Sequence, residues 1–295
     1  MTSTPPAPIS PADLPIRRLT LADLPACLDL SADRSWPREE HKWRLLLTAG
    51  QGYGIDAPPG DPAGGLIACL VVTSYAADHR AIGMVLVAER HARRGIGRRL
   101  MRHALAECAP AAVFLTATDN GRPLYEQLGF KSVGAITTLR GPFTGTLPAA
   151  PGSTVRPATA ADLPGILAYD LPIFGADRTE LLTRLPSFAD HILVAEAPGG
   201  GLAGYGASWP NVTTTVIGPV LADDLATAQA LIAELAARAP LPVRFDVDDR
   251  HRELAAWLRA SGLTGDSRCA LMVLGAPDLP GDATRRFAPY SVALG

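Results

Sequence analysis

A basic segment that contains two glycines has the residue types and spacing that suit an anion. The segment HARRGIGRRLM, residues 91–101, follows the apolar run AIGMVLV, and six arginines lie between positions 90 and 102. Glycine has no Cβ, so the backbone can turn tightly there and approach a ligand closely. A helix that starts at this turn directs unpaired N–H groups and a partial positive charge at one point. A pyrophosphate is an anion that suits such a turn.

Other phosphate-binding patterns fit this segment less well. Gly95 and Gly97 begin a GxGxxG pattern, but Leu100 stands where the third glycine is required. The chain also contains no GxxxxGK[ST]. Taken alone, the segment leaves open a second interpretation, in which it is a solvated basic helix start without a ligand.

The run MVLVAERHARRGIGRRLM resembles the signature of the GNAT superfamily of N-acetyltransferases, in which a strand feeds [Gln/Arg]-x-x-Gly-x-[Gly/Ala] into a helix. Ala92 departs from the Gln or Arg of the family, which removes one side-chain contact but keeps the backbone turn. GNAT proteins also carry a tyrosine four residues before a Gly-Phe pair, and Tyr125 stands four residues before Gly129-Phe130. The resemblance is strong over about residues 14–140 and weak in the second half.

The resemblance implies a fold and a co-substrate. The expected fold class is α/β (α+β), with two tandem GNAT-like domains, each a mixed, mostly antiparallel central sheet flanked by helices. The co-substrate would be acetyl-CoA, with no metal. The residues expected at acetyl-CoA are Met84, Val85, Leu86, Val87, Ala92, Arg93, Arg94, Gly95, Ile96, Gly97, Arg98, Arg99, Asn120 and Tyr125.

The same resemblance implies direct transfer of an acetyl group to a primary amine of a small molecule. Strand N–H groups around Met84 to Leu86 would polarise the thioester carbonyl, and Tyr125 would act as the general acid for the leaving thiolate. The alternative for Tyr125 is a packing role beneath the sheet. An alkylammonium with a pKa near 10.4 must lose a proton before it attacks, so a base is also needed.

The base and the acceptor pocket stay open at this stage. Glu40 and His79 are the leading candidates for the base, beside Glu39, His41 and Asp78, and each is also a plausible surface group. His91 and His103 are expected on helix surfaces. Three aromatic residues are candidate walls of an apolar acceptor pocket, although Trp43 lies in the run WRLLL and suits a core position equally well: Trp36, Trp43 and Tyr75.

Alternating helices and strands must position these residues. Apolar periodicity in the first half predicts strands at 16–19, 64–74, 81–87, 113–118 and 132–140. It predicts helices at 22–30, 37–49, 97–108 and 122–128. This alternation implies a central sheet with helices on both faces.

The chain repeats its opening pattern. Ala-Asp-Leu-Pro begins at Ala22 and again at Ala161, an offset of 139 residues, each time after a short strand. The segment GPFTGTLPAAPGS, residues 141–153, has the composition of a linker. The predicted organisation is a disordered tail over 1–13, a catalytic GNAT domain over 14–141, a linker over 142–153 and a degenerate GNAT-like domain over 154–295.

The second half lacks the chemistry-bearing residues of the first. Asp223 and Asp224 stand where a phosphate would bind, and Leu258 replaces the tyrosine four residues before Gly262. Like charges repel, so coenzyme A binding is disfavoured there. Asp246 and Asp248 share one face of a predicted strand, which makes a metal site conceivable. No second cluster of ligands supports a metal, so a strand end flanked by a helix-capping aspartate is the favoured interpretation. The C-terminal RRFAPYSVALG is expected to form a final strand, and the sequence leaves open whether it completes the sheet of either domain or pairs across chains.

Composition bounds the remaining possibilities. The chain has 295 residues, 47% of them hydrophobic, and a net charge of −2, which argues against nucleic acid and membrane partners. Lys42 and Lys131 are the only lysines among 27 basic residues, a bias typical of G+C-rich bacteria.

Four isolated cysteines and the lack of a signal peptide or membrane span favour a cytoplasmic protein. It would be a monomer or a homodimer, and the rival to an enzyme is a non-catalytic acyl-CoA-binding or scaffold protein.

Overall fold

The computed structural model describes residues 14–147 and 152–294. The predicted tail, residues 1–13, and residues 148–151 of the predicted linker lie outside this range. The chain forms two compact units. The first unit contains the residues up to Val72 together with Met84–Ala109, and the second contains Thr73–Gly83 together with the residues from Pro110 onward. In the described residues, no helix is long and apolar enough to cross a membrane.

The first unit follows the predicted order of elements, with one addition. β1 pairs antiparallel with β2, and β2 pairs antiparallel with β3. Helices α2 and α3 both contact β2. The elements are β1 (Arg17–Leu19), η1 (Leu21–Asp23), α1 (Leu24–Asp33), α2 (Glu40–Ala49), β2 (Gln51–Asp56), β3 (Leu66–Tyr75), β4 (His79–Val87), η2 (Glu89–His91) and α3 (Ile96–Cys108).

Strand β2 is the element that periodicity did not predict. Its sequence QGYGID contains two glycines, which are weak strand formers. A Cβ on Gly52 would lie 2.8 Å from the Cβ of Leu19. The glycine is therefore needed because Leu19 of β1 lies too close for a side chain at position 52. This contact joins residues far apart in the sequence, so local periodicity could not predict it.

The second unit holds the end of the first half and all of the described second half. Its sheet is mostly antiparallel, with parallel pairs between β4 and β5 and between β10 and β11. Helix α8 packs on β9 and β10. The further elements are β5 (Ala112–Ala117), α4 (Arg122–Gln127), β6 (Lys131–Gly141), β7 (Thr154–Pro157), η3 (Ala160–Asp162), α5 (Leu163–Phe174), α6 (Thr179–Leu182), α7 (Leu185–Phe188), β8 (His191–Glu196), β9 (Leu202–Pro210), β10 (Thr215–Ala222), α8 (Leu225–Ala236), β11 (Val243–Asp248), α9 (Arg252–Ala260), β12 (Thr264–Leu274) and β13 (Arg286–Ala288).

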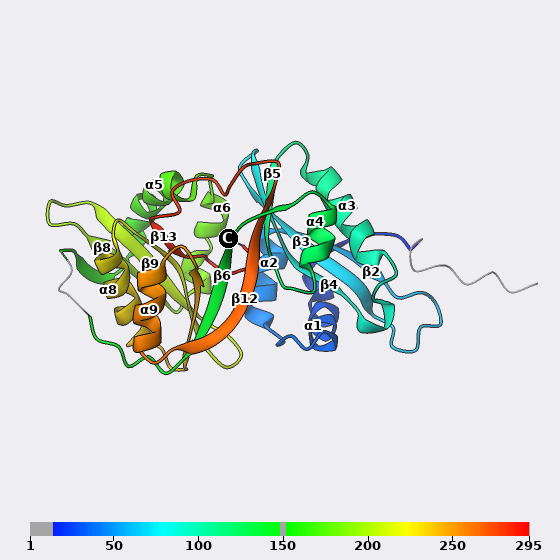
Figure 1. Ribbon diagram of the computed structural model, residues 1–295, viewed down its shortest axis with the longest axis horizontal. Coiled ribbons are helices and arrows are strands. Elements are labelled where there is room, and N and C mark those ends of the chain that lie inside the picture. Colours follow the sequence, from blue (N-terminus) through cyan, green and yellow to red (C-terminus); the bar gives the residue numbers. More distant parts are fainter. Residues whose placement is uncertain (1–13, 148–151, 295) are drawn as a thin grey trace, which may run out of the picture. The chain divides into compact units, whose positions relative to one another are not determined.

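The two halves exchange their long final strands within this unit. β12, from the second half, lies between β5 and β6, with Leu271 opposite Thr116. β6, from the first half, pairs on its other side with β11, with Phe245 opposite Leu139. Figure 1 shows β12 and β6 running side by side. Each half therefore completes the sheet of the other.

The described part of the predicted linker is attached to α9. The N–H of Thr144 donates to the carbonyl of Ser261 at 2.8 Å, and the indole of Trp257 donates to the carbonyl of Thr146 at 3.1 Å. Phe143 packs edge-on against Trp257. Residues 142–147 are thus part of the packed second unit.

Candidate functional site

The predicted anion-binding segment forms a strand, a turn and a helix within the first unit. β4 ends at Val87, and α3 begins at Ile96, within one residue of the predicted boundary. Gly95 precedes the helix with φ +78°, and Arg93 has φ +61°. These two left-handed residues produce the sharp turn, and glycine adopts this conformation without steric cost.

The turn leaves main-chain donors without partners. Among the described residues, no acceptor is hydrogen-bonded to the N–H groups of Arg94, Gly95, Ile96 and Gly97, and the helical ladder starts with Arg99 donating to Gly95. Gly95 is exposed, and a Cβ on it would meet no atom within 4 Å. The turn is therefore open to solvent at Gly95, and its donors lie at the positive end of a helix, where an anion can bind.

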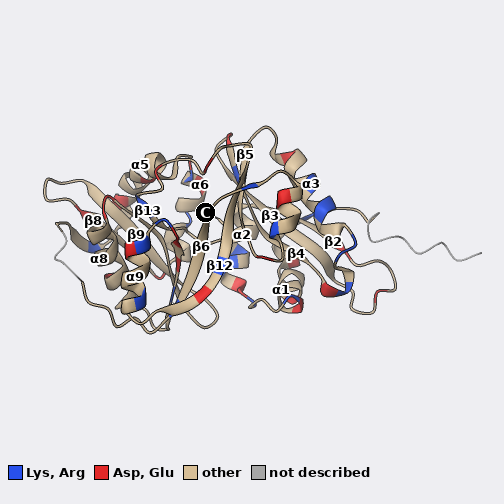
Figure 2. Ribbon diagram, in the orientation of Figure 1, with Lys and Arg blue, Asp and Glu red and all other residues tan. Residues whose placement is uncertain are grey.

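The arginines of the segment divide into two groups. Arg93 and Arg94 are exposed, and Figure 2 shows the concentration of basic residues at the start of α3. Arg99 is half-buried and donates from Nη1 to the carbonyl of Leu14 at 2.5 Å. Arg99 thus anchors the start of the described chain, while Arg93 and Arg94 remain directed at solvent.

An ion-pair cluster beneath the turn was not predicted from the sequence. Asp61 accepts a hydrogen bond of 2.6 Å from Nε2 of His91 and a second from Nε of Arg90 at 3.2 Å. The His91 hydrogen bond, followed by other donors, holds the pKa of Asp61 well below its ordinary value. His91 is buried, so its predicted place on a helix surface is wrong, because its ring packs inward against this carboxylate. The cluster fixes the turn to residues 57–65.

Strand β4 changes direction where the thioester would lie. Met84 has φ +54°, which is rare for a residue with a side chain. Met84 and Leu86 are buried, whereas Val85 and Val87 are half-buried. Sγ of Cys69 contacts the carbonyl of Met84 at 3.6 Å. A left-handed residue interrupts the extended backbone of a strand, and we call this point the kink of β4.

Tyr125 lies on α4 in the second unit. It is buried, and its ring lies against Gly121, where a Cβ would approach within 3.0 Å, and edge-on to Phe130. Burial raises the pKa of Tyr125 above its ordinary value. Its hydroxyl has no hydrogen-bond partner among the described residues. Because burial raises its pKa, the phenol stays protonated at neutral pH. Asn120, another residue expected at acetyl-CoA, is exposed in the turn before α4.

The candidate bases differ in their burial and in their hydrogen-bond and ion-pair partners. Glu39 is buried in an ion pair with Lys42, whereas Glu40 is exposed and accepts from Arg44 at 2.7 Å. His79, in the second unit, is half-buried, and its Nδ1 has no partner among the described residues. His41 is half-buried and Asp78 is exposed. His79 therefore has a buried ring nitrogen without a hydrogen-bond partner among the described residues.

The three aromatic candidates for the acceptor wall occupy different environments. Trp43 is fully buried and donates to Oγ of Ser31 at 3.0 Å, which is the core position left open by the sequence. Trp36 is half-buried in the first unit. Tyr75, in the second unit, is fully buried against the rings of Phe114 and Phe174.

In the second half, the turn between β10 and α8 is occupied by hydrogen-bonded protein groups. Asp224 caps α8 by accepting from the N–H of Thr227 at 2.7 Å. Asp223 accepts from the hydroxyl of Tyr169 at 2.8 Å and forms an ion pair with Arg285. In this turn a carboxylate caps the helix and accepts from the N–H of Thr227, whereas the N–H groups around Gly95 have no acceptor among the described residues.

Strand β13 occupies the gap beside β10 in this half. β10 pairs with β11 only from Thr215 to Ile217. Beyond that point β13 pairs with β10, with Ala288 opposite Val220, and it also contacts β11. In the first half, β4 likewise pairs with β5 only from His79 to Ala81. The predicted C-terminal strand is therefore present, and it belongs to the second half.

The two strand aspartates of the second half are buried on β11 and have protein partners. Asp246 accepts from Oγ1 of Thr138 at 2.6 Å and pairs with Arg244 at 3.1 Å. Asp248 accepts from the N–H of Arg250 at 2.9 Å. Among the described residues, no group of three or more acidic, histidine or cysteine side chains is arranged to hold a metal ion.

Comparison with known proteins agrees with this architecture. Two family models, each an acetyltransferase (GNAT) domain, match residues 67–141 and residues 166–288. The uncharacterized N-acetyltransferase YitH of Bacillus subtilis (strain 168) is 30% identical over 233 residues, which span 77% of this chain and 79% of that protein.

Solved structures show the same fold at low identity. An assigned acetyltransferase from Pyrococcus horikoshii superposes with a TM-score of 0.79 at 18% identity, covering 96% of each chain. A tandem GNAT protein from the clavulanic acid biosynthesis pathway superposes with a TM-score of 0.64 at 17% identity, covering 90% of this chain and 99% of that one. The chain belongs to the GNAT family of acetyltransferases and carries two GNAT domains in tandem.

Proposed function

We propose that this protein transfers an acetyl group from acetyl-CoA to the primary amine of a small molecule. The observation that carries the proposal is the turn at Gly95, which is open to solvent and whose N–H groups at the start of α3 have no acceptor among the described residues. A pyrophosphate fits this turn because several aligned donors and a helix N-terminus converge on one point. Arg93 and Arg94 add positive charge at its edge.

The transfer needs one bond to form and one to break. The neutral amine attacks the thioester carbonyl carbon, the C–S bond breaks, and the amine loses a proton while the thiolate gains one. Main-chain N–H groups at the kink of β4, around Met84 to Leu86, would stabilise the developing oxyanion. Tyr125 would donate the proton to the thiolate, since burial keeps its phenol protonated. His79 or Glu40 would accept the proton of the amine.

The second domain would not bind acetyl-CoA. Its turn carries Asp223 and Asp224, both already engaged by protein donors, and β13 lies in the gap beside β10. A pyrophosphate there would meet carboxylates rather than free N–H groups. We therefore propose a degenerate second domain that contributes structure rather than a second reaction.

Calorimetric titration with acetyl-CoA, followed by an assay of thiol release, tests the proposal. We expect one site per chain and the release of CoA thiol in the presence of a small primary amine. Two sites per chain would show that the second domain also binds. Binding without thiol release across a broad amine panel would favour a non-catalytic acyl-CoA-binding protein, and no binding would overturn the proposal.

A further inference from the structure

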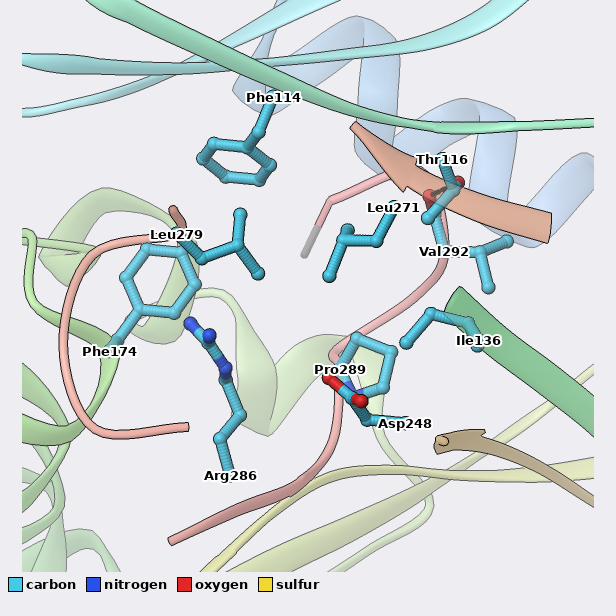
Figure 3. A pocket seen from close by; sticks show the side chains of 10 residues that line it. All are labelled: Phe114, Thr116, Ile136, Phe174, Asp248, Leu271, Leu279, Arg286, Pro289 and Val292. Atoms are coloured by element: carbon cyan, nitrogen blue, oxygen red, sulfur yellow. Dashed lines mark hydrogen bonds between the residues drawn. The ribbon is translucent and has the colours of Figure 1, made fainter. Parts of the chain in front are cut away.

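The second unit contains a small cavity whose size suits solvent. Its volume is about 30 Å³, which gives room for about two water molecules. Figure 3 shows the guanidinium of Arg286 beside the apolar side chains of Phe174 and Leu279, which also line it. The cavity is too small for coenzyme A, whose thioester would instead meet main-chain groups of β4 in the first unit.

The kink of β4 is held by a buried thiol of the neighbouring strand. Met84 has φ +54°, a conformation that is costly for a residue with a side chain and persists where the surroundings hold it. Cys69 of β3 is fully buried, and its thiol donates a hydrogen bond to the main-chain oxygen of Met84 at 3.6 Å. Both residues belong to the first unit, as does the turn at Gly95. The contact fixes the direction in which the Met84 oxygen points.

The thiol of Cys69 keeps the proton that it donates. A hydrogen bond with the thiol of Cys27, on α1, is the main cause that raises the pKa of Cys69, and burial adds to it. A main-chain hydrogen bond from Leu86 to the same sulfur opposes these effects, but the pKa stays well above its ordinary value. Cys69 is therefore a neutral thiol at pH 7, and its sulfur contacts main-chain groups on both sides of Val85.

These contacts orient the peptide group that carries the N–H of Val85. The oxygen of Met84 and the N–H of Val85 share one planar peptide, and among the described residues the cis peptide is Gly218–Pro219. In a trans peptide the carbonyl and the N–H point in opposite directions. The N–H of Val85 therefore points away from the thiol of Cys69.

The position of Val85 lets its N–H reach a ligand. Val85 is half-buried, whereas Met84 and Leu86 are buried. β4 pairs with β5 only over His79–Ala81, so Val85 lies beyond the paired part of the strand. An N–H in this place, on a strand that leads into the turn at Gly95, can donate to the oxygen of a bound thioester.

We propose that Cys69 is a positioning residue, whose thiol directs the N–H of Val85 toward the thioester oxygen of acetyl-CoA. The proposal rests on the proposed acetyltransferase function, and it assigns the oxyanion donor to Val85 within the stretch from Met84 to Leu86. As the amine attacks, the thioester oxygen gains negative charge. A donor that is already directed at this oxygen stabilises the charge without reorganisation.

Cys69→Ser and Cys69→Ala form the matched pair that tests the thiol. The two new side chains have nearly the same volume, but only serine can donate a hydrogen bond to Met84. We expect Cys69→Ala to lower kcat for small primary amines by about 10- to 100-fold, approaching the loss of an oxyanion donor itself. Cys69→Ser should restore most of kcat. Calorimetry should give acetyl-CoA affinities within about threefold of the wild type for both variants, because the contact acts in the transition state.

Cys27→Ala is the control for the loss of a buried thiol. Cys27 is also fully buried and contacts Cys69, but among the described residues its thiol has no hydrogen bond to Met84. We expect Cys27→Ala to lower Tm about as much as Cys69→Ala does and to leave kcat near the wild-type value. Equal losses of kcat in these two variants, or an equal loss in Cys69→Ser, would show an effect of packing and would overturn the inference.

Infrared spectroscopy tests the direction of the N–H without turnover. Difference spectra of bound acetyl-CoA, labelled with ¹³C at the thioester carbonyl, report the hydrogen bond to that carbonyl, because a donor lowers its stretching frequency. We expect a lower frequency in the wild type and in Cys69→Ser than in Cys69→Ala.

The outcomes separate this inference from the proposed function. Equal carbonyl frequencies in the three proteins, with acetyl-CoA bound, would overturn the inference and leave the acetyltransferase standing. If no amine is acetylated, the infrared comparison still decides, because it needs binding alone. If acetyl-CoA does not bind to the wild type, calorimetry overturns the proposed function and the inference with it.

Discussion

At the scale of single residues, the environment of each side chain decides which chemistry it can perform. Tyr125 and His91 are both buried, yet their protons are controlled differently. The phenol of Tyr125 has no acceptor among the described residues, and burial raises its pKa. His91 donates to Asp61, whose pKa is held low by that bond. The first arrangement keeps a proton available for transfer, and the second holds a charge for structure.

Replacing Tyr125 with phenylalanine tests its role as the acid. We expect kcat to fall by about 10²-fold or more, the usual contribution of a general acid, with little change in acetyl-CoA affinity. Because the pKa of Tyr125 is raised, its ionisation should not limit the wild-type rate at any pH up to about 10. Steady-state kinetics between pH 6 and 10 measure this, with Tyr53→Phe, at a buried tyrosine of β2, as the control. An unchanged kcat would remove Tyr125 from the mechanism.

The Asp61 carboxylate predicts an acid sensitivity of the first unit. Its folded pKa lies below the unfolded value of about 3.9, so its stabilising contribution is present above that value and is lost as pH falls further. Asp61→Asn should lower the urea midpoint at pH 7 and reduce its decline between pH 5 and pH 3. Parallel pH profiles for the two proteins would contradict the assignment.

At the scale of elements, the turn before α3 is a local structure that works through its backbone. Its left-handed Gly95 starts the helix and leaves several N–H groups without acceptors among the described residues. The Asp61 cluster then supports the turn from below. In the second half, the equivalent helix α8 starts with a carboxylate cap. There an N–H group at the helix N-terminus binds the side chain of Asp224 in place of a ligand.

Gly95→Ala should weaken acetyl-CoA binding, because alanine at φ +78° costs about 1–2 kcal/mol and the turn would relax. We expect a loss of affinity of roughly 10-fold in calorimetry. Gly200→Ala, in the loop between β8 and β9, is the matched control, since Gly200 also has a positive φ, of +86°, with no atom near an added Cβ. Equal affinity losses in both variants would point to general destabilisation.

At the scale of the whole chain, the repeated halves depend on each other through exchanged strands. β12 of the second half lies between β5 and β6 of the first, and β6 pairs with β11 of the second. A domain border drawn at the linker therefore cuts through one sheet of the second unit. The boundaries 14–141 and 154–295 remain a proposal about ancestry and binding rather than about independent folding.

Expressing residues 1–147 and 152–295 as separate chains tests this dependence. Neither fragment alone should give a cooperative thermal transition, because each would expose an unpaired strand edge. Co-expression should restore a one-to-one complex that binds acetyl-CoA. Size-exclusion chromatography and circular dichroism measure both results, and a first fragment that folds alone and binds acetyl-CoA would contradict the expectation.

Local patterns in the sequence determined the turn at Gly95, the helix that follows it, the position of Tyr125 and the presence of two related halves. These features depend on backbone preference and on short spacings, which neighbouring residues encode. The tertiary structure alone decided the pairing of β12 with β5 and the place of β13 beside β10. Such features depend on contacts between residues far apart in the sequence, such as Ala270 with Ala117 and Ala288 with Val220, and no local periodicity specifies which strand becomes the neighbour of another.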